Sequence, residues 1–201
     1  MRSGLFLVWC SVVAESRLPR PMPTPSIFPI LHEDVQKSLG SSAIAFSFVI
    51  YDLKPEPGGS KRGFVVNRHV NIVDANKNAK PYQKRVRELL LGAFSNPLYY
   101  CNLEQHGAPV FGPGIPLAVM VEFLISRPRS HYRKDGITTG VSAPVHHTQR
   151  PDATKLWRCL EDALTGIVWH DDAQVVSQDV SKGWSFNSEH EIRVVVSRED
   201  R

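Results

Sequence analysis

The sequence is poor in cysteine and has no paired arrangement of it. Only three cysteines occur among 201 residues: Cys10, Cys101 and Cys159. No two of them stand at the spacing of a zinc finger, and an odd number cannot all be paired in disulfides. A disulfide framework is therefore excluded, and a reducing compartment, the cytoplasm, is expected.

A long apolar run is also missing. Segment 4–14 is apolar after a charged start at Arg2, as in a signal peptide, but it is too short for a membrane helix of about 20 residues. It is equally consistent with an early start codon, with Met22 as a later start, and the proline-rich stretch 19–29 isolates it. We expect residues 1–41 to be a disordered extension, signal-like or mis-started. Residues 42–198 should form the folded domain, with no contact with a membrane.

A strong net charge is absent, but the charges are unevenly distributed. The formal net charge is only +4. Nine Lys and Arg residues in 54–87 stand against two acids, and five in 127–150 stand against one. The acids gather later, in 161–179. Two basic tracts beside an acidic patch suit a polyanion held near a cation-binding centre, and solvated surface charge is the alternative interpretation.

Several familiar enzyme motifs are missing as well. The loop 57–62 lacks the Gly-Lys-Ser/Thr ending of a phosphate-binding loop, and no nucleophile-elbow motif supports a Ser/His/Asp triad. The histidines form no zinc-site spacing, which favours contact with solvent or phosphate. The histidines considered are His131, His146, His147 and His170.

Hydrophobic periodicity predicts an α+β domain. Helices are expected at 81–94 and 153–164, where apolar residues recur on one face. The expected strands are 43–51, 63–66, 70–73, 117–125, 174–180 and 191–196. The fold class is therefore one small domain with a mixed, largely antiparallel sheet of four or five strands and two main helices. The stretch 127–150 reads as irregular.

Three aspartates flank the second expected helix. Asp152 precedes its first turn, and Asp171 and Asp172 follow its end. The helix spans about 18 Å and the eight residues 165–172 span about 25 Å if extended, so an antiparallel return would bring the pair beside Asp152. Carboxylates this close would need a cation or protons to neutralise them, and hard oxygen ligands of this kind suit Mg²⁺. The alternative interpretation is a helix N-cap for Asp152 and an ordinary turn for the pair.

Three segments of the sequence resemble the signature of RusA-type Holliday junction resolvases. They are Arg-Pro-Asp-Ala-Thr-Lys-Leu at 150–156, Leu-Glu-Asp-Ala-Leu-Thr-Gly at 160–166 and Trp-His-Asp-Asp-Ala-Gln-Val-Val at 169–176. Further likeness is found at 59–62, 74–76 and 127–132. The resemblance spans roughly residues 43 to 197 and is closest to phage and prophage members.

The resemblance implies a homodimeric endonuclease that resolves four-way DNA junctions by paired, symmetric nicks in recombination and repair, with Mg²⁺ or Mn²⁺ as cofactor. Asp152 matches the first catalytic aspartate of the family. Asp171 and Asp172 match its closing acidic pair, and Asp172 is the stronger metal ligand. Arg158 stands where members often carry a catalytic Lys, and Arg contacts phosphate but does not give up its proton. The implied metal ligands are the three aspartates.

One departure from the family pattern is serious. The second aspartate, two residues after the first, is Thr154 here. A hydroxyl adds no charge, so cation affinity should fall unless Glu122 or Asp171 compensates. Glu122 interrupts the apolar run 117–125 and is expected either to face outward on an edge or to lie near the site. A second interpretation is therefore a branched-DNA-binding protein with lost or weakened cleavage. A third, a secreted non-specific nuclease, rests on residues 1–14 alone.

DNA contact is expected from cations in the two basic tracts and around Asp152, mostly to backbone phosphates. These cations are Lys61, Arg62, Lys77, Arg127, Arg129, Arg133, Lys134, Arg150 and Lys155.

Overall fold

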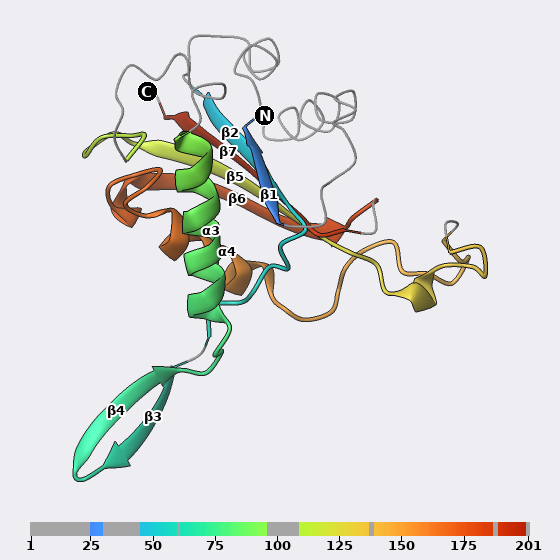
Figure 1. The fold of residues 1–201 in the computed structure, drawn as a ribbon, viewed down its shortest axis with the longest axis horizontal. Coiled ribbons are helices and arrows are strands. Elements are labelled where there is room, and N and C mark those ends of the chain that lie inside the picture. Colours follow the sequence, from blue (N-terminus) through green and yellow to red (C-terminus); the bar gives the residue numbers. More distant parts are fainter. Residues whose placement is uncertain are drawn as a thin grey trace.

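A five-stranded mixed sheet forms the centre of the molecule (Figure 1). The structure is a computed structural model that describes residues 25–29, 45–59, 61–95, 109–136, 139–186 and 189–199. In spatial order the strands are β1 (Ser26–Pro29), β2 (Ala45–Tyr51), β7 (Glu191–Arg198), β5 (Leu117–Ile125) and β6 (Val175–Trp184). β5 and β6 run parallel, and the other neighbouring pairs are antiparallel.

Two helices, α3 (Ala79–Phe94) and α4 (Ala153–Leu164), cover one face of this sheet (Figure 1). Because successive side chains of a strand point to opposite faces, Val119, Val121 and Phe123 of β5 all face the helices. They form one core with the buried stripe of α4, in which Leu156, Leu160 and Leu164 are fully buried. The predicted fold class, a mixed and largely antiparallel sheet with two main helices, is confirmed.

The local sequence sets the start of α3, and a contact from α3 holds the end of α4. Pro81 lies in the first turn of α3, where a missing backbone N–H costs little, so α3 begins two residues before the predicted start. α4 has the predicted bounds. At its C-terminal end, Arg87 of α3 donates to the carbonyl oxygens of Asp162 (2.7 Å) and Thr165 (3.0 Å). Carbonyl oxygens at the end of a helix have no backbone N–H donor within it, so Arg87 satisfies these two and holds this end of α4 in place.

β1 is an exception to the disordered extension expected over residues 1–41. Ser26–Pro29 pairs with β2 and forms an edge of the sheet. An edge strand tolerates proline because one row of its backbone groups does not pair. Residues 1–24 and 30–41 lie outside the described residues, so the expectation for them stays a prediction.

The predicted hairpin forms, but as a separate two-stranded sheet. β3 (Lys61–Val66) and β4 (His69–Asp74) pair only with each other and project from the domain beyond the start of α3 (Figure 1). Asn67 and Arg68 join them with positive φ angles of 49° and 65°. This is the backbone of a two-residue type I′ turn, whose twist matches that of the paired strands.

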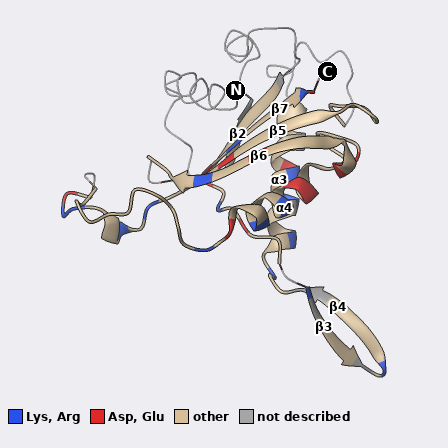
Figure 2. Ribbon diagram, turned by 180° about the vertical axis from the view of Figure 1, so that it is seen from behind, with Lys and Arg blue, Asp and Glu red and all other residues tan. Residues whose placement is uncertain are grey.

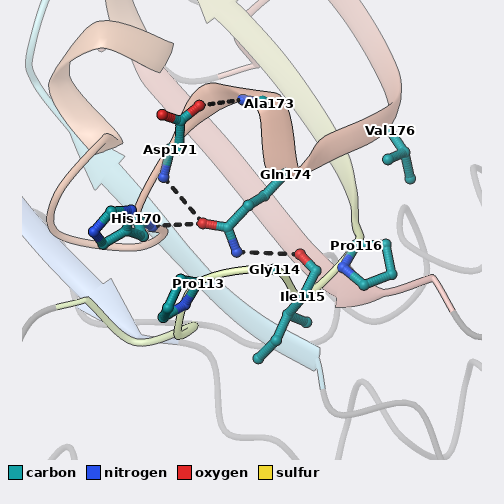
Figure 3. Close-up of a pocket in the computed structure, with 9 residues that line it drawn as sticks. All are labelled: Pro113, Gly114, Ile115, Pro116, His170, Asp171, Ala173, Gln174 and Val176. Carbon is teal, nitrogen blue, oxygen red and sulfur yellow. Dashed lines mark hydrogen bonds between the residues drawn. The ribbon is translucent and has the colours of Figure 1, made fainter.

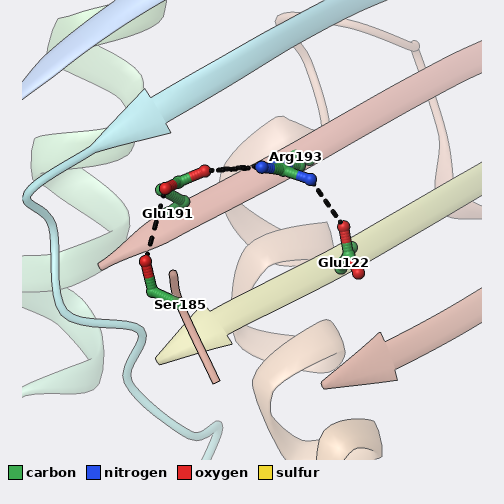
Figure 4. Close-up of polar contacts among 4 residues, drawn as sticks. All are labelled: Glu122, Ser185, Glu191 and Arg193. Carbon is green, nitrogen blue, oxygen red and sulfur yellow. Dashed lines mark hydrogen bonds and ion pairs between the residues drawn. The ribbon is translucent and has the colours of Figure 1, made fainter. Parts of the chain in front are cut away.

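Glu122 belongs to a partly buried ion-pair network on the sheet face turned away from the helices (Figure 4). Arg193 of β7 lies 3.1 Å from Glu122 and 2.8 Å from Glu191, which also accepts from the Ser185 hydroxyl at 3.3 Å. Burial raises the pKa of Glu122, and Arg193 opposes that shift. Both expectations for Glu122 are therefore wrong, because β5 is an internal strand and its alternation turns this carboxylate away from α4.

Candidate active site

Asp152 stands immediately before α4 with its carboxylate exposed. Its backbone carbonyl accepts hydrogen bonds from Lys155 and Leu156 at 3.1 Å each, but its side chain makes no capping hydrogen bond. The carboxylate lies 3.2 Å from the ammonium group of Lys155. The N-cap interpretation thus explains the position of Asp152 but not its side chain, which stays accessible to a ligand.

The exposed face of α4 carries polar side chains in one row. Thr154, Arg158 and Glu161 follow at intervals of four and three residues, the spacing that places side chains above one another on a helix. Thr154 and Arg158 are exposed, and Glu161 is half-buried. This row leads from Asp152 towards the C-terminal end of α4.

Asp172 lies at that C-terminal end. Its Oδ1 atom accepts hydrogen bonds from the Thr165 hydroxyl and, at 3.2 Å, from the indole N–H of the buried Trp169. Thr165 and Trp169 are held together by an isolated β-bridge, which closes the turn after α4. Two neutral donors therefore fix the orientation of a carboxylate that remains exposed to solvent.

Glu161 is the residue that the sequence interpretation missed. Burial, then the negative charges of Asp172 and Asp162, raise its pKa from 4.5 to about 7, and Arg158 opposes the shift. The Thr165 hydroxyl that donates to Asp172 Oδ1 also lies 2.9 Å from the backbone carbonyl oxygen of Glu161, so both residues lie at this end of α4. We call their two carboxylates the acidic cluster. The three-residue interval from Arg158 on a predicted helix was the signal that could have identified Glu161.

Asp171 has a structural task. It precedes the short helix η2 (Asp172–Gln174), and its Oδ1 atom accepts from the backbone N–H of Ala173 at 2.8 Å. The buried Gln174 completes the turn, because its Oε1 atom accepts from the backbone N–H groups of His170 (2.9 Å) and Asp171 (3.0 Å). Its Nε2 atom donates to the carbonyls of Gly112 and Ile115.

These residues line a shallow pocket of about 330 Å³ (Figure 3). Gln174 uses both ends of its amide on backbone groups from two segments, 112–115 and 170–171. Its amide therefore joins these two segments and fixes the loop that carries Asp172. The residues that line the pocket thus support the position of the acidic cluster.

The expected meeting of Asp152 with Asp171 and Asp172 is wrong. Segment 165–172 does not run back along the helix; it curls into a turn, with Gly166 donating to the carbonyl of Trp169 at 2.7 Å. Asp152 and Asp172 therefore lie at opposite ends of the 12-residue α4, about 18 Å apart at 1.5 Å per residue. In the part of the chain that the structure describes, no three His, Cys, Asp or Glu side chains group to hold a metal ion.

β6 gives an independent measure of the same separation. It starts at Val175, three residues after Asp172, and near its end Lys182 donates to the carbonyls of Gln149 (2.5 Å) and Pro151 (2.8 Å), beside Asp152. Seven residues of strand separate these contacts, roughly 23 Å at 3.3 Å per residue. α4 and β6 thus agree that the two acidic positions mark opposite ends of one face.

A family model described as endodeoxyribonuclease RusA matches residues 56–196. This chain belongs to the RusA family. The matched region runs from the loop before β3 to the last residues of β7, so it includes both helices and the acidic residues at either end of α4. No curated protein matches the chain.

Membership of the RusA family implies endodeoxyribonuclease activity on branched DNA. Within this RusA-family chain, Thr154 is exposed in the first turn of α4, two residues after Asp152. A carboxylate at this position would lie beside Asp152, whereas Glu161 lies two helical turns further along. The chain therefore has its additional acid at the Asp172 end of α4 and not at the Asp152 end.

The cations expected to contact DNA lie on separate parts of the chain, namely the β3–β4 hairpin and the segment after it, the loop 127–150, and the start of α4. Figure 2 shows the Lys and Arg positions along the ribbon. Lys155 is at the site itself, bound to Asp152. Arg127 packs 5.3 Å from the ring centre of Trp184 and donates to the carbonyl of Pro144. Its guanidinium is therefore already engaged in contacts within the protein. The others with described side chains are exposed: Lys61, Lys77, Arg129, Arg133, Lys134 and Arg150. The side chain of Arg62 lies outside the description.

Two of the histidines meet at Trp184. The ring centres of His131 and His147 lie 5.0 Å and 4.2 Å from that of Trp184. Burial lowers the pKa of His147, and a neutral ring suits this packing. With no third ligand grouped near them among the described residues, packing inside the loop 127–150 accounts for the pair better than zinc binding.

Among the described residues, no helix is both long and apolar enough to span a membrane.

Proposed function

We propose that this RusA-family protein is a Mg²⁺-dependent endonuclease that, as a homodimer, resolves Holliday junctions by paired, symmetric nicks. The family match over residues 56–196 carries the proposal. The exposed face of α4 supports it, because Asp152, Arg158 and Asp172 are all open to a ligand as large as DNA. A two-fold dimer would present two such faces to opposite strands of a symmetric junction.

The donor chemistry at the Asp172 end of α4 fits Mg²⁺. This cation is commonly held by one or two carboxylates together with waters and substrate phosphates. Asp172 and Glu161 supply two carboxylates, and a cation between them would relieve the repulsion that helps to raise the pKa of Glu161. When bound, Mg²⁺ or Mn²⁺ would activate water and stabilise the leaving oxygen.

Each residue of the face has a separate task in the proposal. Arg158 binds a phosphate oxygen and stabilises its charge, since a guanidinium keeps its proton. Thr165 and Trp169 orient Asp172 through its Oδ1 atom. Asp171 positions the loop through its bond to Ala173 and is a support rather than a metal ligand.

Asp152 acts at the other end of the face. About 18 Å from Asp172, it does not share a cation with it in this conformation. It holds Lys155 at 3.2 Å, which places a cation where a DNA strand lying along α4 would pass. The two ends of α4 thus contact different phosphates of one strand.

Cleavage of a mobile four-way junction tests the proposal, with linear duplex as the comparison substrate and EDTA as the comparison condition. We expect nicking of the junction in Mg²⁺ only. Asp172→Asn should lower the rate at least 100-fold, on the order of the loss of one transition-state stabilising group, and Asp152→Asn at least tenfold, about the cost of one charged contact. Asp179→Asn, an exposed aspartate on β6, is the matched control and should cleave normally. Full activity in either site variant removes that residue from the proposal.

Thr154 favours a second candidate function, binding of branched DNA with weakened cleavage. The chain lacks the family's second aspartate, and no group of three metal-binding side chains is found among the described residues. Junction binding that persists in EDTA, together with no nicks in Mg²⁺ or Mn²⁺, would select this function over the first.

A further inference from the structure

The β3–β4 hairpin, Lys61–Asp74, is exposed on both faces. Its strands pair with each other and with no other strand of the described chain. Every side chain described in it is exposed. Four of these side chains are large and apolar: Phe64 (47 % exposed), Val65 (69 %), Val70 (69 %) and Ile72 (65 %). We call this hairpin the arm.

The arm exposes apolar side chains on opposite faces. Phe64 is opposite Asn71, and Val65 is opposite Val70 one residue further on, so Phe64 points to one face and the valine pair to the other. An isolated two-stranded hairpin is only marginally stable in water, and exposed apolar patches usually mark an interaction site. The composition of the arm therefore indicates a bound partner.

The root of the arm is clamped onto α4 beside the candidate active site. The backbone N–H of Gly58 donates to the carbonyl of Lys155 at 2.7 Å. A Cβ atom at Gly58 would lie 3.5 Å from the Arg158 side chain, and one at Gly59 would lie 2.7 Å from the backbone nitrogen of Asn76. The Asn76 side chain closes the root by donating to Glu56 (3.2 Å) and to the carbonyl of Pro57 (2.9 Å). A ligand lying along α4 therefore meets the arm where it leaves the domain.

The charges of the arm select the partner. Residues 61–74 contain three Lys and Arg residues against one acid, Asp74. One cation, Arg68, occupies the turn between β3 and β4, with a φ of 65°. Glycine is the residue that such a turn favours, so arginine there adopts a backbone conformation that its side chain disfavours. A second copy of the arm would bring like charges together, whereas a polyanion would neutralise them.

We propose that the arm contacts branched DNA, with Arg68 on a phosphate and the apolar side chains against bases left unstacked at the branch point. This inference rests on the proposed function and adds a binding element to it. A two-stranded ribbon has the width that a DNA groove admits. Apolar side chains insert at unstacked base steps, and aromatic rings stack on exposed bases. A branch point offers such bases and a continuous duplex does not, so the arm would favour junctions over linear DNA.

Equilibrium binding to a labelled four-way junction and to linear duplex tests the inference. Binding is measured on the full chain carrying Asp172→Asn, which prevents cleavage during the measurement. Phe64→Ser combined with Ile72→Ser removes one apolar group from each face, and Arg68→Gly removes the tip charge while giving the turn its favoured residue. Leu91→Ser is the matched apolar control, because Leu91 is also 47 % exposed but lies on α3. Lys84→Gln on α3 is the matched charge control.

We expect the Phe64/Ile72 double variant to bind the junction about tenfold more weakly, the loss typical of one stacking contact, with a smaller change on duplex. Arg68→Gly should weaken both complexes and reduce the slope of log Kd against log salt by about one. Neither control should change. Junction affinity within about twofold of the parent in both arm variants would overturn the inference, being below the loss of one contact.

The molecular mass in solution tests the alternative partner of the arm, a second copy of the chain. A double variant that falls from dimer to monomer would show that the arm joins two copies of the chain, and would also overturn the inference. If the proposed function is wrong, the result is a different one, because the unmodified chain then nicks no branched DNA in Mg²⁺ or Mn²⁺. If it does nick junctions while the arm variants bind them normally, only the arm inference fails.

Discussion

The ionised form of Glu161, on the exposed face of α4, is unfavourable in the folded protein. Its pKa of about 7 means that the folded protein takes up a proton more readily than the unfolded chain, where the value is 4.5. Folding is therefore favoured as the pH falls through 7, and the ionised carboxylate is a cost above that pH. Burial contributes most to this cost and Asp172 contributes next.

Glu161→Gln should therefore be more stable than the unmodified protein at pH 8, and equally stable below about pH 4.5. We expect a gain of about 1 kcal/mol at pH 8, well below the full value of the pKa shift because the side chain is only partly buried. Urea unfolding at both pH values measures it, with Asp179→Asn as the control. A gain that is the same at both pH values would show that ionisation is not its cause.

Thr154 is the residue at which this chain departs from its family. Thr154→Asp would place a carboxylate beside Asp152 in the first turn of α4, where the helix dipole favours a negative charge by about 0.3–1 kcal/mol. Folding should therefore be preserved. Because the proposal holds Mg²⁺ at the Asp172 end of α4, the Mg²⁺ concentration needed for nicking should change by less than about tenfold, the smallest effect typical of a changed ligand environment. The exposed Thr148→Asp is the control. A Mg²⁺ requirement lowered by about tenfold or more would contradict the proposal, because the Asp152 end would then bind a cation as well.

At the scale of single elements, the loop before β6 depends on Gln174. Its amide makes four hydrogen bonds to backbone groups, two from residues 170–171 and two to residues 112 and 115. Gln174→Ala should lower the free energy of unfolding by about 2–4 kcal/mol, because buried backbone groups lose their partners. Nicking should fall in parallel, since Asp172 loses its fixed position. Thermal unfolding and cleavage rates measure both effects. An unaffected melting temperature would contradict the claim that the Gln174 hydrogen bonds stabilise this loop. Gln178→Ala, at an exposed glutamine on β6, is the control.

Local patterns were enough to predict most elements of the fold. α4 begins and ends where its apolar stripe does, and the turn Asn67-Arg68 lies where the hairpin was expected. β1 was missed because proline-rich segments resemble linkers, and only pairing with β2 reveals an edge strand. The path of 165–172 was also missed, since it is set by the β-bridge between Thr165 and Trp169 and by the hydrogen bonds of the Gln174 amide to residues 170 and 171.

The candidate site was predictable in part for the same reason. Asp152, Arg158 and Asp172 were found because the sequence around them resembles a family. Their arrangement was not, because distance between residues on either side of a helix depends on how the chain turns after it. Glu161 was missed because its importance comes from a neighbour 11 residues away in sequence, Asp172.

At the scale of the whole molecule, the sheet has its core on one face and an ion-pair network on the other. Arg193 balances Glu122 and Glu191 on the face away from the helices. Arg193→Met should lower the free energy of unfolding by about 3–5 kcal/mol at neutral pH, because it removes the guanidinium that contacts both the buried Glu191 and the partly buried Glu122. Acid should reduce this loss, since burial raises the pKa of Glu122 and protonation removes its charge. Thermal unfolding at pH 7 and pH 5 measures it, and a loss that grows in acid would contradict the ion-pair explanation.

The proposed cleavage of branched DNA by this RusA-family chain is tested by the pattern of cuts. A mobile four-way junction, labelled in turn on each strand, is incubated with the full chain in Mg²⁺. We expect nicks at symmetry-related positions on two opposing strands, with no cuts in a linear duplex of the same sequence. A chain that binds the junction but leaves all four strands intact, in Mg²⁺ and in Mn²⁺, would contradict it.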